Sequence, residues 1–272
     1  MSAPTLRLAV LGDPLSFTRS PDLHRAGLAS LGLAGESVAT RTPVADLPAR
    51  LTGLAGAGFT GANLTHPLKE AVLACLSRVS EASRLARSVN TVGFAADGWW
   101  GETTDGPGLV DLLRSLGRDP ARERAVLLGG GGAARSLALA LSASSARETT
   151  VATRRPAAAA ELWRDIPGAR LVGWRSEDEV GAMSEASLVI NATPLAGEES
   201  PAPLHAIARR ALILDLVYGA EITPWVRQAR AEGRQAYDGL GLLVFQARRS
   251  LALWLARPVP VEPLARAVGW PR

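Results

Sequence analysis

The chain of 272 residues contains one cysteine, two methionines and few aromatic residues, which make up 5% of the sequence. The single cysteine, Cys75, excludes a disulfide within the chain and is typical of a reducing compartment. The sequence shows no basic segment followed by an apolar run of the kind found in signal peptides. No apolar run approaches the roughly 20 residues that a membrane helix needs. We therefore expect a cytoplasmic protein without a membrane partner.

Lysine is almost absent as well: of the 30 Lys and Arg residues, only Lys69 is a lysine. The pI of about 10.1 reflects the high pKa of arginine, since the formal net charge is only +4. The arginines are scattered, without the basic runs and interleaved aromatics of nucleic-acid-binding proteins, so we expect no nucleic-acid partner. His24 and His205 are far apart in sequence, and no Cys, His, Asp or Glu cluster has the spacing of metal ligands, so we expect no metal site.

Hydrophobic residues make up 47% of the chain and occur in short runs that alternate with helical patterns. This alternation predicts an α/β fold with parallel sheets and right-handed crossovers. The pattern restarts after residue 103, which predicts two lobes: residues 1–103 with 238–272, and residues 104–237. Strands are predicted at 6–12, 36–42, 59–65, 88–95, near 99–100 and at 149–155, with three more in ARLVGW, SLVINAT and RALILDLVYG.

A glycine-rich loop lies between a predicted strand and a predicted helix in AVLLGGGGAARSLALAL. Glycines let a backbone turn tightly and approach a pyrophosphate, which binds at the N-terminus of the following helix. This context predicts a dinucleotide site of the Rossmann type, formed by Gly129, Gly130, Gly131, Gly132 and Ala133. A glycine turn needed only for packing is the alternative interpretation.

The end of the next strand indicates which dinucleotide binds. An NAD site has an acidic residue there, which accepts a hydrogen bond from the ribose hydroxyls. Here Thr153, Arg154 and Arg155 follow the strand, and the first acidic residue is Glu161. Two guanidinium groups favour the 2′-phosphate of NADP, so NADP is the predicted cofactor. A solvated pair of arginines is the alternative.

Lys69 is the one basic group of the chain whose amine can lose a proton near neutral pH if its surroundings lower its pKa. It opens a predicted helix after a strand, a position where open α/β sheets bind ligands. Asp105, at the predicted boundary of the lobes, is a candidate partner. Proton transfer by Lys69 is one interpretation; chance retention of a surface lysine, with Asp105 as a helix N-cap, is the other.

Eight segments occur in the order that is typical of the shikimate dehydrogenase family, which the chain resembles over essentially its whole length. They are GDPLSFTRSP, NLTHPLKE, SVNTVG, TTDGPG, GGGGAAR, VINATP, DLVYG and DGLGLLVFQ. The resemblance implies a substrate-binding lobe, a Rossmann-type NADP-binding lobe and an active site between them. It also implies reversible, NADPH-dependent reduction of 3-dehydroshikimate to shikimate in chorismate and aromatic amino-acid biosynthesis.

The same resemblance implies roles for individual residues. Lys69 and Asp105 match the catalytic pair, and which of the two transfers the proton is open. The positions that bind substrate are Thr18, Ser20, Thr65, Asn90, Tyr218 and Gln246, with Asn63 in the same motif. Contacts near the nicotinamide fall on Glu81, Leu216 and Gly239.

Two segments depart from the family pattern. The sequence has Thr18-Arg19-Ser20 where Ser-x-Ser is common, and Thr153-Arg154-Arg155 where Asn-Arg-Thr is common. The first change concerns substrate selectivity, and the second adds positive charge at the predicted 2′-phosphate site.

Three alternatives to an NADP-dependent shikimate dehydrogenase are open. A quinate/shikimate dehydrogenase would accept quinate or use NAD, and a non-catalytic NADP sensor would need neither Lys69 nor Asp105. A nucleic-acid-binding protein is the third. A small-molecule substrate is the expected partner, and the chain is expected to be a monomer or a homodimer.

Overall fold

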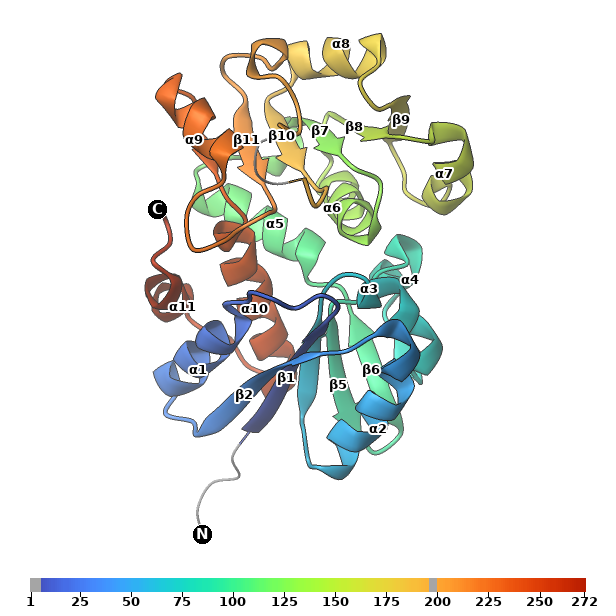
Figure 1. Cartoon of the computed structure of the whole chain (residues 1–272), viewed down its shortest axis with the longest axis vertical. Coiled ribbons are helices and arrows are strands. Elements are labelled where there is room, and N and C mark those ends of the chain that lie inside the picture. The colour runs from blue at the N-terminus through green and yellow to red at the C-terminus, as the bar shows by residue number, and fades with distance from the viewer. Residues whose placement is uncertain (1–5, 196–199) are drawn as a thin grey trace. The chain divides into compact units, whose positions relative to one another are not determined.

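The computed structural model describes residues 6–195 and 200–272. The chain divides into two compact units (Figure 1), which we call the first unit (up to Gly108, with Leu243–Trp270) and the second unit (Leu109–Leu242, with Pro271–Arg272). The chain passes between them within two helices, α5 (Asp105–Ser115) and α10 (Leu240–Leu255). The boundaries predicted at 103/104 and 237/238 lie just before these helices. Residues 1–5, part of the stretch searched for a signal peptide, are outside the described residues.

The first unit contains a mixed six-stranded sheet in the order β2-β1-β3-β5-β6-β4. β1 pairs in parallel with β2 and β3, whereas β5 is antiparallel to both β3 and β6. A tight turn joins β5 directly to β6. Short β4 pairs in parallel with β6. The strands are β1 (Leu6–Gly12), β2 (Gly35–Arg41), β3 (Gly61–Leu64), β4 (Arg78–Val79), β5 (Thr91–Ala95) and β6 (Gly98–Glu102).

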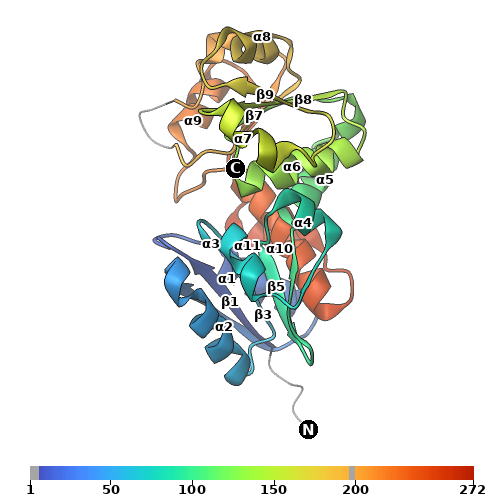
Figure 2. The ribbon, with the colours of Figure 1, turned by 90° about the vertical axis from the view of Figure 1, so that its right-hand side faces the viewer.

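Helices cover both faces of this sheet: α2 lies on one face and α10 on the other (Figures 1 and 2). On β3, Ala62 and Leu64 join the apolar cluster that includes α2, while the alternate residue Asn63 contacts Ser250 of α10. The helices of the unit are α1 (Ser20–Ser30), α2 (Leu47–Gly56), α3 (Leu68–Ala71), α4 (Glu81–Ala86) and α11 (Val261–Val268), with 3₁₀ turns η1 (Val44–Asp46) and η2 (Val72–Cys75).

The second unit contains a parallel sheet in the order β12-β11-β10-β7-β8-β9. This is the order of the doubly wound dinucleotide-binding fold. The strands are β7 (Arg124–Leu128), β8 (Glu148–Thr153), β9 (Ala169–Gly173), β10 (Leu188–Asn191), β11 (Leu212–Asp215) and β12 (Ala236–Tyr237). β10 and β11 are buried along their whole length, as expected for strands covered on both faces.

Helices α8 and α9 pack on one face of the second sheet, and α5 and α6 lie on the other (Figure 1). The helices that follow the strands are α6 (Gly132–Ala143), α7 (Pro156–Trp163), α8 (Glu177–Glu185) and α9 (Pro224–Ala231), with 3₁₀ turns η3 (Pro120–Arg122) and η4 (Leu204–Ala206). Within the described residues, no helix is long and apolar enough to cross a membrane.

The predicted α/β class and two-sheet organisation are confirmed. The second sheet is parallel, as predicted, whereas the first is mixed, because β5 runs antiparallel to β3 and β6. The segment 44–55, whose sequence pattern predicts one helix, divides into η1 and α2. The predicted helix that Lys69 opens divides into a single turn of α-helix and a 3₁₀ turn. The two-residue strands β4 and β12 were not predicted, because a strand of two residues is too short to show an alternating pattern.

Candidate active site

The polar residues of the first unit gather at one edge of its sheet. β1, β3 and β6 all end at this edge, and β5 begins there because it runs antiparallel to its neighbours. Segments distant in sequence therefore leave the sheet side by side. They carry Thr18 and Ser20 after β1, Thr65 and Lys69 after β3, Asn90 before β5, and Asp105 after β6.

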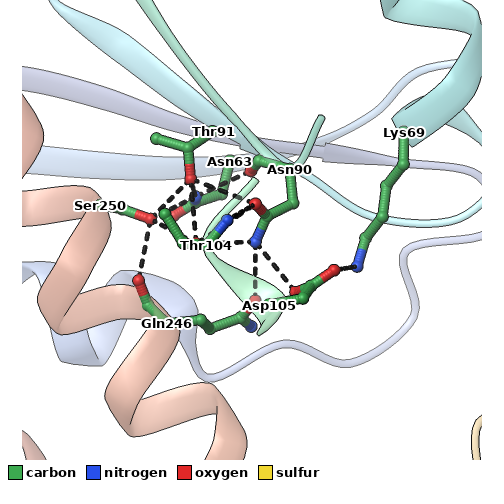
Figure 3. A network of polar contacts seen from close by, with 8 residues as sticks. All are labelled: Asn63, Lys69, Asn90, Thr91, Thr104, Asp105, Gln246 and Ser250. Carbon is green, nitrogen blue, oxygen red and sulfur yellow. Dashed lines mark hydrogen bonds and ion pairs between the residues drawn. The ribbon is translucent and has the colours of Figure 1, made fainter. Parts of the chain in front are cut away.

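Lys69 and Asp105 form an ion pair at this edge (Figure 3), with 2.6 Å between Nζ and Oδ2. Lys69 lies in the single turn α3, and Asp105 is the first residue of α5. The side chain of Asp105 is 3% exposed, whereas that of Lys69 is 21% exposed. A nearly buried carboxylate needs a cationic or hydrogen-bonding partner, and Lys69 supplies one from a side chain that is itself partly exposed.

Asn90 holds the other oxygen of Asp105. Its Nδ2 lies 3.0 Å from Asp105 Oδ1, 2.8 Å from Gln246 Oε1 and 2.9 Å from Thr104 Oγ1 (Figure 3). Its Oδ1 accepts from the Thr104 backbone N–H at 2.7 Å, which fixes the orientation of the amide. An amide NH₂ has two hydrogens, so it cannot serve all three acceptors at once. The Asn90 amide therefore donates to two of these three acceptors at a time.

Asn63 supports this arrangement from the α10 side of the sheet. Its Nδ2 lies within hydrogen-bond distance of Asn90 O, Thr91 Oγ1 and Ser250 Oγ, at 2.9, 3.0 and 3.0 Å. Its Oδ1 lies 2.9 Å from His24 Nε2. Both polar atoms of Asn63, a predicted substrate contact, are therefore engaged by groups of the protein.

His24 is fully buried and sets the orientation of the Asn63 amide. Because Asn63 Oδ1 only accepts hydrogen bonds, His24 Nε2 carries the proton, and Nδ1 accepts from Ser37 Oγ at 2.8 Å. Burial lowers the pKa of His24 to about 4, opposed by its hydrogen bond to Asn63 and assisted by the charge of Arg25. The imidazole is therefore neutral at physiological pH.

Thr18 and Ser20 place two hydroxyls together at the N-terminus of α1. The two Oγ atoms lie 3.3 Å apart, and the backbone N–H of Ser20 donates to Thr18 Oγ1 at 3.2 Å. Arg19 between them turns away to Asp22 and to the backbone oxygen of Ala267, so only the hydroxyls face each other. Neutral hydroxyls and a helix N-terminus form a suitable surface for a carboxylate.

The structure does not bring every predicted residue into this network. Glu81 is exposed at the start of α4. Tyr218, predicted to bind substrate, belongs to the second unit, as do Leu216 and Gly239. Thr91, Thr104 and Ser250 were not predicted. Thr91 and Thr104 lie in SVNTVG and TTDGPG, two of the segments that resemble the family. Ser250 lies one helical turn after Gln246 and donates a hydrogen bond from its hydroxyl to the Gln246 backbone oxygen at 3.0 Å.

In the second unit, the glycine loop connects β7 to α6. Gly129 has a φ of +111°, and a Cβ on it would lie 2.9 Å from Thr193 Cγ2. A Cβ on Gly130 would lie 3.2 Å from Thr153 Oγ1, whereas one on Gly131 would meet nothing within 4 Å. Gly131 is the N-cap of α6 and, having no side chain, forms no side-chain hydrogen bond to the first N–H groups of Gly132–Ala143. This loop fits a pyrophosphate.

Arg154 and Arg155 are both exposed directly after β8. The first acidic residue beyond them, Glu161 of α7, forms an ion pair with Arg164, the residue that follows this helix. No carboxylate follows β8 at the position that would accept a ribose hydroxyl, so the local charge is positive, as a 2′-phosphate requires.

Asn191 and Asp215 form a further buried pair at the ends of β10 and β11. Asn191 Nδ2 donates to Asp215 Oδ1 at 2.8 Å, and Thr193 Oγ1 donates to Asn191 Oδ1 at 2.6 Å. Burial raises the pKa of Asp215, although hydrogen bonds from Thr223, Asn191 and Val217 oppose that shift. These residues lie in the segments VINATP and DLVYG. The sequence signal that could have identified them is a polar residue at the end of an apolar strand.

Among the residues that the structure describes, no group of three or more His, Cys, Asp or Glu side chains could hold a metal ion. The second unit has the Rossmann dinucleotide-binding fold, and the first unit presents a lysine–aspartate pair at the edge of a mixed sheet. These features define a two-unit oxidoreductase of the dinucleotide-binding class.

Comparison with known proteins identifies the family. Residues 10–92 match the model of the shikimate dehydrogenase substrate binding domain. The NADP(+)-dependent shikimate dehydrogenase of Acidiphilium cryptum is 39% identical over 97% of this chain and 96% of its own. The chain belongs to the shikimate dehydrogenase family.

Solved structures show the same fold. Shikimate 5-dehydrogenase of Thermus thermophilus, in complex with NADP(H) and shikimate, matches with a TM-score of 0.86 and 35% identity, covering 97% of this chain and 99% of that one. The 5-ketofructose reductase of a Gluconobacter strain also matches, with a TM-score of 0.83 at 24% identity over 98% of both chains. The fold is therefore shared with an enzyme named for a different substrate.

Proposed function

We propose that this protein is a shikimate dehydrogenase, which interconverts 3-dehydroshikimate and shikimate with NADP(H) in chorismate and aromatic amino-acid biosynthesis. The observation that carries the proposal is the Lys69–Asp105 pair, held by Asn90 at the sheet edge of a chain that belongs to this family. Asp105 is almost buried, and its conformation is fixed from two sides.

The first unit binds the substrate. The hydroxyls of Thr18 and Ser20 bind its carboxylate, and Thr65, Asn90 and Gln246 bind its hydroxyls. Tyr218 contributes from the loop after β11. Asn63 acts by holding the backbone oxygen of Asn90, because its own amide is engaged within the protein.

The Lys69–Asp105 pair handles the proton. NADPH, when bound, supplies the hydride that reduces the ketone carbon. The ketone oxygen then needs a proton, which the Lys69–Asp105 pair provides; in the reverse direction the pair accepts it. The Lys69 ammonium also stabilises the developing alkoxide, while Asp105 orients that ammonium. Positioned acid–base groups of this kind contribute roughly 10²–10⁴-fold to the rate.

The second unit binds NADP. Gly129, Gly130, Gly131, Gly132 and Ala133 hold the pyrophosphate at the start of α6, beside Thr153. Arg154 and Arg155 bind the 2′-phosphate, and Glu81, Leu216 and Gly239 lie near the nicotinamide. The predicted lobes, 1–103 with 238–272 and 104–237, correspond in this proposal to substrate and cofactor binding. We place the enzyme in the cytoplasm as a monomer or homodimer.

A quinate/shikimate dehydrogenase is the second candidate. The observation that favours it is Thr18, because its additional methyl group stands where serine is common and changes the shape of the carboxylate site. A non-catalytic NADP sensor is disfavoured, because such a protein has no need of the Lys69–Asp105 pair.

The test is the absorbance of reduced nicotinamide with purified protein, with shikimate and quinate each combined with NADP and NAD. We expect rapid turnover with shikimate and NADP alone. Comparable rates with quinate would support the second candidate. Binding of NADP without turnover in any combination would contradict both and leave the sensor.

A further inference from the structure

The segment that follows β11, residues 216–220, carries two residues of the proposed site, Leu216 and Tyr218. It contains neither helix nor strand, and we call it the Tyr218 loop. Leu216 N–H donates to Asn191 O at 2.9 Å, and beyond this bond the segment is held by individual backbone hydrogen bonds instead of a regular ladder. The structure shows such contacts at both ends of the loop.

Asp215 fixes the start of the Tyr218 loop. Its Oδ1 accepts from the backbone N–H of Val217 at 3.1 Å and from Asn191 Nδ2 at 2.8 Å. Its Oδ2 accepts from Thr223 Oγ1 at 2.7 Å, beyond the loop. The carboxylate thus joins the loop to β10 and to the start of α9.

Arg272 fixes the other end. Its Nη1 donates to Ala220 O at 2.6 Å and its Nη2 to Gly219 O at 2.9 Å. Through Nε and Nη2, the same guanidinium pairs with Asp238 Oδ2 at 3.0 and 2.6 Å. Arg230 Nη2 in turn donates to Arg272 O at 2.6 Å, which holds the residue itself.

Asp238 connects this clamp to the proposed nicotinamide contact. Its side chain is 2% exposed, and its Oδ1 accepts from the backbone N–H of Leu240 at the start of α10. The next residue, Gly239, donates its N–H to Val217 O at 3.0 Å, and a Cβ there would lie 2.2 Å from Leu216 O. The loop and Gly239 are therefore in direct contact, and Arg272 spans both.

We infer that the Arg272–Asp238 pair is a positioning device that holds the Tyr218 loop against Gly239 in its productive conformation. The inference rests on the proposed function for the role of Tyr218. Arg272 acts through the loop and through Asp238, because its hydrogen bonds go to backbone oxygens of the loop and to the Asp238 carboxylate. Displacement of a positioning group by about 1 Å can reduce turnover substantially.

The first experiment compares R272A and R272K with the wild type and with R210A, which changes an exposed arginine of the same unit. For R272A we expect KM for shikimate to rise about tenfold and kcat to fall, because the loop is no longer in place. Affinity for 2′,5′-ADP, which lacks the nicotinamide, should stay within twofold, because the glycine loop and Arg154 are unchanged. R272K should restore the melting temperature through its ion pair with Asp238. It should not restore KM, because an ammonium lacks the planar fork that reaches both carbonyls.

Two further measurements separate positioning from general destabilisation. In the double variant R272A/Y218F, the factor by which KM rises should be clearly smaller than the product of the factors for R272A and Y218F, because both changes act on one contact. Hydrogen exchange in R272A should accelerate at the amides of 216–220 and not in the glycine loop.

The inference would be overturned if the KM factors of the two single variants multiplied in the double variant. It would also be overturned if R272A had a lower melting temperature and kcat with unchanged KM and unchanged hydrogen exchange in 216–220. The exchange measurement needs no substrate. If the wild type fails to oxidise shikimate, the proposed function fails, while the clamp on the loop is still tested by exchange.

Discussion

Lys69 illustrates at the scale of a single residue how composition points to chemistry. A chain that otherwise carries its positive charge on arginine has one primary amine on a side chain, and that amine lies 2.6 Å from a nearly buried carboxylate. Arginine in the same place would keep the charge but could not release a proton at neutral pH. The residue type therefore indicates proton transfer, and the structure shows that the predicted partner, Asp105, forms an ion pair with it.

We predict that Lys69→Arg lowers kcat for shikimate oxidation by roughly 10²–10⁴-fold, because the guanidinium cannot exchange the proton. KM should change much less, since the charge beside Asp105 is kept. The measurement is steady-state kinetics over a pH range with both substrates varied.

Arg50→Lys is the matched control, because Arg50 is exposed on α2 and the change reverses the direction of substitution. It should leave kcat within twofold. Turnover of Lys69→Arg close to the wild type would rule out proton transfer by Lys69.

At the scale of elements, strand ends determine where chemistry is placed. In the second unit every strand runs in the same direction, so the segments after β7, β8, β10 and β11 all leave one edge of the sheet. In the first unit the reversed strand β5 brings Asn90, which precedes it, to the edge where its neighbours end. One short hairpin thus explains how Asn90 and Asp105 come to share a hydrogen bond.

The residues at the end of β8 give a prediction about the cofactor. Arg154→Ala should raise KM for NADP by about 10- to 100-fold, which corresponds to the loss of one charge-assisted contact with the 2′-phosphate. KM for NAD should change little, because NAD lacks that phosphate. The Arg155→Ala variant, measured in parallel, shows how much the second guanidinium contributes to the binding of NADP.

Arg164→Ala is the control, since Arg164 is an exposed arginine directly after α7 that pairs with Glu161. Equal effects of Arg154→Ala on NADP and NAD would show that this guanidinium does not read the 2′-phosphate.

For the whole molecule, buried titratable groups make stability depend on pH. The pKa of His24 falls from 6.5 to about 4 on folding, so between these values the unfolded chain binds a proton that the folded chain does not. Its contribution is complete above about pH 6.5 and is lost as the pH falls towards 4. Asp215 and Glu179 have raised pKa values because of burial, so their contributions have the opposite sign and decline as the pH rises through the acidic range.

We predict that the free energy of unfolding of the wild type falls between pH 7.5 and pH 5, with His24 contributing about 2 kcal/mol of the loss. His24→Gln should be less stable at pH 7.5 but should lack that part of the pH dependence. Urea unfolding followed by tryptophan fluorescence at both pH values measures the difference.

His205→Gln, which changes an exposed histidine, should keep the pH dependence of the wild type. An unchanged pH dependence in His24→Gln would show that another group is responsible.

The sequence by itself determined the elements and the chemistry. Alternating apolar runs and helical patterns predicted the α/β class, the glycine loop predicted the dinucleotide fold, and the ordered segments predicted the family. The first two signals are local, because each depends on residues within one strand, turn or helix entry. The third depends on the order of short segments along the whole chain.

Only the tertiary structure decided which groups meet. Asn63 is bound to His24 within the protein, Ser250 joins the network from a helix almost 190 residues later in the chain, and Arg272 reaches the Tyr218 loop from more than 50 residues away. Such contacts depend on strand order and, in the first unit, on the reversed direction of β5. Neither property can be predicted from a short stretch of sequence. A buried polar group that lacks a hydrogen-bond partner costs free energy of folding. Which partner it finds depends on the residues that the folded chain brings next to it, and these are often far away in sequence.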